Sequence, residues 1–160
     1  MAAQVGAISA EHLICASDGG ISAMADRNVI AVLLPATSFY LGKPYARARH
    51  MVDAGVAVAV ATDFNPGSSP SLNIQFAMNL ACLKYRLTPA EALTAVTLNG
   101  AAAIARAGTR GSAEAGKQAD LVVWDAPDLD YVFYRYGSNL AHTVIKRGAV
   151  VSQPAPLRQT

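Results

Sequence analysis

The chain is poor in the residues that mark several classes of protein. Only 15% of its 160 residues are charged, the formal net charge is +2, and 52% are hydrophobic. Such a composition is unlike that of a disordered chain, so we expect one folded unit with a sizeable core. Lysine and arginine are scattered along the sequence, which argues against a nucleic-acid partner.

Long apolar runs and cysteine clusters are also lacking. No run approaches the roughly 18–20 residues that a membrane-spanning helix needs, so we expect no membrane partner. Residues 1–9 lack a basic segment followed by an apolar core, and therefore predict no secretory signal. Cys15 and Cys82 have no metal-site spacing and fit reduced thiols, with a disulfide between them as the open alternative. These features together predict a cytoplasmic protein.

The most informative feature present is a small apolar run that ends in one carboxylate. Alanine and valine fill residues 57–61, Asp63 follows, and residues 65–68 form an Asn-Pro-Gly-Ser turn. The run suits a strand that is buried on both faces, and α/β folds place their chemistry at the ends of such strands. We therefore expect a metal or substrate near Asp63. The alternative is an aspartate that only caps its own turn.

Three apolar segments separated by helical segments predict a parallel sheet at the start of the chain. We expect strands at 7–15, 29–34 and 56–62. Two helices should connect them, at 21–26 with Ser17 and Asp18 as caps and at 46–54 with Gly55 at its end, and a loop should cover 36–44. A βαβαβ order of this kind requires parallel pairing.

The second half of the sequence changes from helical to strand-like character. Helices are expected at 72–85 and 88–106, and the second begins with a capping box whose first helical residue is proline. A glycine-punctuated turn at 110–117 precedes a strand at 119–125. Residues 142–152 then predict a β-hairpin. This tail is expected to form a small β module.

These motifs give the sequence a resemblance to the imidazolonepropionase family of the amidohydrolase superfamily, specifically to its C-terminal part. The matching stretches are residues 10–13, 31–35, 61–68, 78–82, 87–93, 111–125 and 143–148. The Thr-Asp-Phe-Asn-Pro-Gly-Ser stretch at 62–68 is the most specific of them. The Gly-Lys-x-Ala-Asp-Leu-Val pattern at 116–122 is common to many amidohydrolases and says little about substrate.

The resemblance implies an α/β fold built from part of a barrel. That fold is the C-terminal part of a metal-dependent amidohydrolase (β/α)8 TIM barrel, about three βα units, followed by a small β-sandwich segment. The partial barrel would cover residues 1–109, the β-sandwich module 110–153 and a tail 154–160. On this alignment Asp63 stands at the end of the eighth barrel strand.

The resemblance also implies a reaction and roles for named residues. The family hydrolyses the cyclic amide C–N bond of 4-imidazolone-5-propanoate to N-formimidoyl-L-glutamate, in histidine degradation. Asp63 would hold one zinc or iron ion and accept a proton from the attacking water, and His12 would be catalytic. Asn65, Gly67 and Ser68 would contact the small-molecule substrate.

Most of the family's metal site has no counterpart in this sequence. Its His-x-His pair, a further metal histidine, a catalytic glutamate and the residues that bind the substrate carboxylate are all missing, and a catalytic zinc normally takes three protein ligands. We therefore expect a chain with little activity alone, or one completed by the other barrel half or a second copy. The alternatives are a non-enzymatic α/β domain that binds a small acid or a protein, and a fragment of another amidohydrolase.

Overall fold

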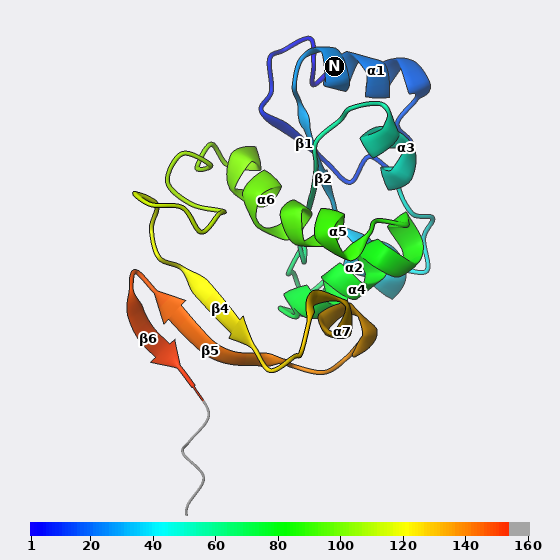
Figure 1. Cartoon of the computed structure of the whole chain (residues 1–160). Coiled ribbons are helices and arrows are strands. Elements are labelled where there is room, and N and C mark those ends of the chain that lie inside the picture. The colour runs from blue at the N-terminus through cyan, green and yellow to red at the C-terminus, as the bar shows by residue number, and fades with distance from the viewer. Residues whose placement is uncertain (154–160) are drawn as a thin grey trace, which may run out of the picture.

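Two three-stranded sheets organise the computed structural model, which describes residues 1–153 (Figure 1). The expected tail at 154–160 lies outside the described residues. The strands are β1 (Ser9–Glu11), β2 (Ile30–Leu33), β3 (Val58–Val60), β4 (Leu121–Trp124), β5 (Ala141–Lys146) and β6 (Ala149–Ser152). The helices are α1 (Asp18–Asp26), α2 (Pro35–Tyr40), α3 (Ala48–Asp53), α4 (Ile74–Tyr85), α5 (Pro89–Val96), α6 (Leu98–Ala103) and α7 (Leu129–Tyr134).

The first sheet confirms the parallel βαβαβ prediction, with strand order β1-β2-β3. All three residues of β3 are buried, which agrees with a strand covered on both faces. β1 is shorter than the predicted 7–15, because His12 and Leu13 turn into the left-handed region at φ +63° and +56°. β1 is therefore short. Because the three strands are parallel, their carboxyl ends lie along the same edge of the sheet.

Helix starts follow the capping signals of the sequence. Ser17 caps α1 by accepting a hydrogen bond from the Gly20 N–H at 3.2 Å. Thr88 and Glu91 form the predicted capping box of α5, with both reciprocal bonds present. Gly55, with φ +85°, follows α3 as expected. Local polar groups thus set these boundaries before any packing is considered.

Three helical features differ from the sequence prediction. The predicted loop at 36–44 contains α2, because Pro35 begins a helix as well as ending the preceding strand. The predicted helix at 88–106 is two helices, α5 and α6, broken at Thr97, whose Oγ1 donates back to the Leu93 carbonyl at 2.7 Å. The short helix α7 was not predicted at all.

Helix α7 is held against helix α4 by a hydrogen bond and by packing. The Asn79 Nδ2 of α4 donates to the Phe133 carbonyl at 2.9 Å, and Val132 of α7 is buried. Asp128 caps the helix by accepting from the Tyr131 N–H at 2.8 Å. This cap before an apolar run is the signal that could have revealed α7 in the sequence.

The second sheet is antiparallel, in the order β4-β5-β6, and it confirms the predicted hairpin at 142–152. A sandwich needs a second sheet facing this one, and residues 110–153 form a single sheet, so the β-sandwich stays a prediction. The division at residue 109 likewise stays a prediction. Within residues 1–153 no helix has the length and apolar character that crossing a membrane requires.

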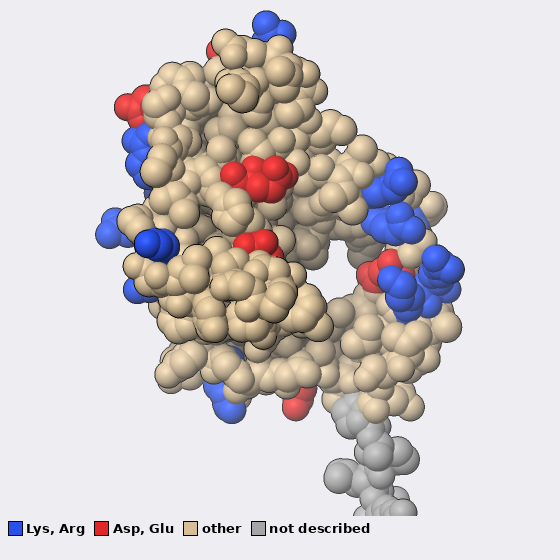
Figure 2. Space-filling model, turned by 180° about the vertical axis from the view of Figure 1, so that it is seen from behind, with Lys and Arg blue, Asp and Glu red and all other residues tan. Residues whose placement is uncertain are grey.

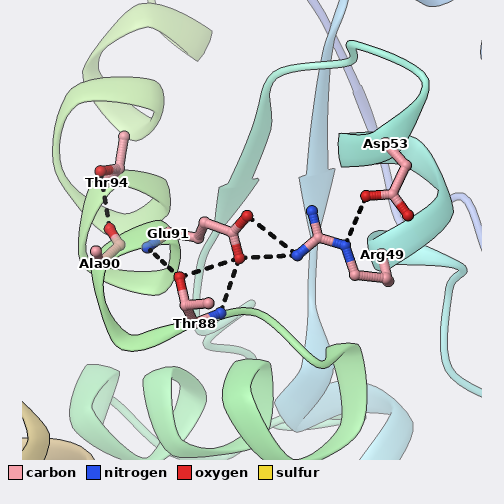
Figure 3. A network of polar contacts seen from close by, with 6 residues as sticks. All are labelled: Arg49, Asp53, Thr88, Ala90, Glu91 and Thr94. Carbon is pink, nitrogen blue, oxygen red and sulfur yellow. Dashed lines mark hydrogen bonds and ion pairs between the residues drawn. The ribbon is translucent and has the colours of Figure 1, made fainter.

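An ion-pair network joins α3 to α5 on the outside of the parallel sheet (Figure 3). Arg49 donates to both carboxylate oxygens of Glu91 and also to Asp53. Glu91 at the same time accepts from the backbone N–H of Thr88 at 2.8 Å. The capping box of α5 is thereby tied to a neighbouring helix.

Candidate active-site edge

Asp63 lies just beyond the carboxyl end of β3, in a left-handed conformation with φ +52°. Aspartate tolerates this region better than most residues, and such outliers cluster at functional sites. Two side chains hydrogen-bond to the backbone carbonyls of Asp63 and of the residue before it. Asn65 Nδ2 donates to the Asp63 carbonyl at 2.7 Å, and the hydroxyl of the buried Ser69 donates to the Thr62 carbonyl at 2.6 Å.

The carboxylate of Asp63 accepts a hydrogen bond from a residue of the helix that follows the neighbouring strand β2. Thr37 Oγ1 donates to Asp63 Oδ2 at 2.6 Å. Thr37 lies in the first turn of α2, directly after β2, and is 7% exposed. Sequence analysis missed this residue, because it placed 36–44 in a loop; the only available signal was a threonine two positions after the strand-ending proline.

The turn after Asp63 is held together by the side chain of Asn65. Asn65 Oδ1 accepts from the backbone N–H groups of Gly67 and Ser68, at 2.9 and 2.8 Å. Asn65 Nδ2 donates to Ser68 Oγ at 2.9 Å as well as to the Asp63 carbonyl. The three residues expected to contact substrate therefore already hydrogen-bond one another.

His12 stands one residue after β1, with its side chain exposed and its backbone N–H donating to the Val32 carbonyl at 3.0 Å. It therefore shares a sheet edge with Asp63, because all three strands are parallel. β2 lies between them, so their strands are two spacings apart, about 10 Å. The structure places both residues at the same sheet edge and gives no hydrogen bond between them.

The described residues supply only part of a metal site. Asp63 offers an oxygen donor suited to zinc or iron, but no group of three or more His, Cys, Asp or Glu side chains that could hold an ion occurs within residues 1–153. A catalytic zinc normally takes three protein ligands. The described residues can therefore supply one ligand of such an ion, Asp63, but not the full set of protein ligands.

A separate hollow of about 780 Å³ lies between the helices and the antiparallel sheet, where the space-filling view shows an opening (Figure 2). Its walls include Leu98 and Leu121, both partly exposed, and Trp124. Neither Asp63 nor His12 lines it. The hollow is thus distinct from the sheet edge that carries Asp63 and His12.

Comparison with known proteins identifies relatives along almost the entire chain. The sequence is 56% identical over 151 residues to the imidazolonepropionase of Geobacillus kaustophilus, covering 94% of this chain and 36% of the relative. It is 52% identical over 158 residues to that of Treponema denticola, covering 98% and 38%. The chain spans about a third of the length of these relatives. Its expected position in their C-terminal part stays a prediction.

Solved structures share the same fold. A zinc-bound adenosine deaminase from Xanthomonas campestris superposes with a TM-score of 0.82 and 28% identity, over 89% of this chain and 36% of that one. A zinc complex of atrazine chlorohydrolase from Arthrobacter aurescens gives 0.83 at 23% identity, over 97% and 39%.

The pattern of the Amidohydrolase family matches residues 6–151, which is most of the sequence. Together with the parallel strands and the aspartate at their carboxyl edge, this match settles the family. The chain belongs to the amidohydrolase family.

Proposed function

We propose that this chain supplies one edge of the active site of a cytoplasmic imidazolonepropionase. The reaction would be hydrolysis of the cyclic amide C–N bond of 4-imidazolone-5-propanoate to N-formimidoyl-L-glutamate, in histidine degradation. The observation that carries the proposal is the 52–56% identity to imidazolonepropionases along 94–98% of the chain. The position of Asp63 at the carboxyl edge of a parallel sheet supports it.

Opening a cyclic amide needs a water activated as nucleophile and an acid for the leaving nitrogen. Asp63 is the proposed proton acceptor and metal ligand, since one of its oxygens is free of hydrogen bonds to residues 1–153. His12 is the proposed second catalytic group, because its exposed ring stands at the same edge. A bound zinc or iron ion would lower the pKa of a water to about 7 and polarise the carbonyl.

The Asn65 turn is the proposed substrate-binding element. Gly67 is exposed, and Ser68 is half-buried. Their bonds to Asn65 hold the turn in one shape, so that a polar substrate group would meet preorganised partners. Asn65 would then bind substrate at the cost of bonds within its own turn.

The remaining metal ligands must come from outside the described residues. We propose that they lie in the rest of the barrel, on another segment of the protein, a partner chain or a second copy. The three-stranded sheet supports this, because within residues 1–153 β1 and β3 each have one edge that pairs with no strand. The outer edge of β3 is contacted instead by Asn99 Nδ2, which donates to the Val58 carbonyl at 2.8 Å.

The experiment compares the chain alone with the assembled barrel that contains it. Mass spectrometry would monitor product formation, which we expect only in the assembled barrel. In the isolated chain, we expect less than one zinc or iron ion per molecule. Asp63→Asn should lower turnover in the barrel by at least about a thousandfold, the scale of removing an essential catalytic group.

Asp53→Asn is the matched control, because Asp53 is an exposed carboxylate on α3, which precedes β3, whereas Asp63 follows β3. It should leave turnover unchanged. Near-normal rates in the Asp63→Asn barrel would remove Asp63 from the reaction. Tight stoichiometric metal in the isolated chain would show that the site needs no further ligands.

A further inference from the structure

Asp63 is fixed in place at both its backbone and its carboxylate. The Asn65 amide holds its backbone carbonyl, and Ser69 holds the carbonyl of the preceding residue. The third contact is the hydroxyl of Thr37, which reaches Oδ2 across the gap between the ends of β2 and β3. A left-handed aspartate is thus constrained by three polar side chains.

The Thr37 contact has the features of a built interaction. Its 2.6 Å length is that of a strong O–H···O bond to a carboxylate. Thr37 is only 7% exposed, so its hydroxyl needs a hydrogen-bond partner within the protein. Proline at the first position of α2 and the burial of Pro35 and Ala36 fix the helix turn that carries it. The donor is therefore rigid.

The two oxygens of the Asp63 carboxylate differ as a result. Oδ2 accepts from Thr37, whereas Oδ1 accepts no hydrogen bond from the part of the chain that the structure describes. A carboxylate that is free to rotate about its last bond would offer both oxygens interchangeably. Here one oxygen is engaged by the protein and the other is left for a ligand.

We propose that Thr37 is a positioning residue that holds the Asp63 side chain in one rotamer, with one carboxylate oxygen engaged and the other left open at the sheet edge. The inference rests on the proposed role of Asp63 and goes beyond it by naming the residue that orients the carboxylate. Thr37 does not touch the reacting atoms. Its effect on a bound ion or water passes entirely through Asp63.

The test uses Thr37→Val, which keeps the shape of the side chain and removes the donor, and Thr37→Ser, which keeps the donor. In the isolated chain, the three-bond NMR couplings between Hα and Hβ of Asp63 report the χ1 rotamer that places its carboxylate against Thr37. We expect a single rotamer in the parent chain and in the serine variant. The valine variant should show averaged couplings while staying folded, with a modest fall in its unfolding midpoint from the lost hydrogen bond.

In the assembled barrel, the valine variant should bind zinc about 10- to 100-fold more weakly, the usual effect of losing a group that orients a metal ligand. Its kcat should fall more than its KM changes, and serine should restore most of both losses. Zinc affinity and Asp63 couplings that stay unchanged in the valine variant would overturn the proposal. So would a serine variant as defective as valine, since that would indicate packing and not hydrogen bonding.

Asp63→Asn, tested in parallel, separates the two proposals. If Asp63→Asn abolishes turnover while Thr37→Val has no effect, only the positioning role fails. If Asp63→Asn retains turnover, the proposed function of Asp63 itself fails, whatever the Thr37 variants do.

Discussion

The guanidinium of Arg49 bonds to both carboxylate oxygens of Glu91, at 3.0 and 2.8 Å, and so joins α3 to α5. The Arg49 bond, followed by the Thr88 backbone bond, lowers the pKa of Glu91 from 4.5 to about 2. The two side chains are about one-third exposed, so water weakens the pair. The network therefore contributes modest stability that depends on pH.

Glu91→Gln should lower the free energy of unfolding at pH 7 by about 1 kcal/mol, because the charge is lost while glutamine can still serve in the capping box. The pKa of Glu91 is lower in the folded state, so its contribution is fully present above pH 4.5. It is lost as the pH falls through about 2. Urea unfolding at pH 7 and at pH 2 should show a much smaller difference between variant and parent at the lower pH.

Asp53→Asn is the control for this prediction. Asp53 pairs with the same arginine but is 62% exposed, and a helix pair four residues apart contributes only about 0.3–0.5 kcal/mol. Equal stability of the Glu91→Gln variant and the parent at pH 7 would show that the pair between Arg49 and Glu91 contributes nothing.

Gly111→Ala should be much more damaging than alanine at another left-handed glycine. Gly111 has φ +93°, and an added Cβ would lie 2.7 Å from the Ala101 Cβ and 3.0 Å from the Thr97 carbonyl oxygen. Gly116 has φ +88° with open space around it. We expect about 1–2 kcal/mol of backbone strain for Gly116→Ala. Gly111→Ala should add about 1–3 kcal/mol of overpacking.

Thermal and urea unfolding of the two variants would measure this difference. Both lose the same conformational freedom in the unfolded chain, so the gap between them isolates the close approach of the 110–117 turn to α6. Variants of equal stability would mean that the turn does not pack on α6 in solution.

Cys82 should react with iodoacetamide far more slowly than Cys15. Both thiols are free, but Cys15 is exposed whereas Cys82 is half-buried. Burial, with a smaller contribution from the nearby charge of Glu91, raises the pKa of Cys82 to about 11. At pH 8 only about one Cys82 thiol in a thousand is then the reactive thiolate.

Mass spectrometry of peptides after timed alkylation would give the two rates. We expect at least about a tenfold difference in the folded chain and near equality in urea. A Cys15→Ser variant that is labelled at the parent's rate would contradict the prediction, because the fast reaction would then belong to Cys82.

Local chemistry explains what could be predicted from the sequence. The capping box at Thr88 and the Ser17 cap are formed by residues within three positions of each other, so their letters alone reveal them. The buried alanine–valine strand before Asp63 could also be predicted, because a strand that is covered on both faces is apolar throughout and does not alternate apolar with polar residues. The family resemblance, confirmed by the match over residues 6–151, rests on such contiguous stretches.

The errors lie where contacts between distant residues decide. Helix α7 has a local cap at Asp128, but it packs on α4 through Asn79, 54 positions away from Phe133. The break at Thr97 is the exception, because its bond to the Leu93 carbonyl is local. Thr37 and Asp63 are 26 positions apart, and nothing in either neighbourhood signals their bond. Amino-acid order determined the strands, the starts of α1 and α5, the family and the aspartate at a strand end. Only the tertiary structure decided which oxygen of that aspartate is held, because parallel pairing of β2 and β3 is what places the two side chains side by side.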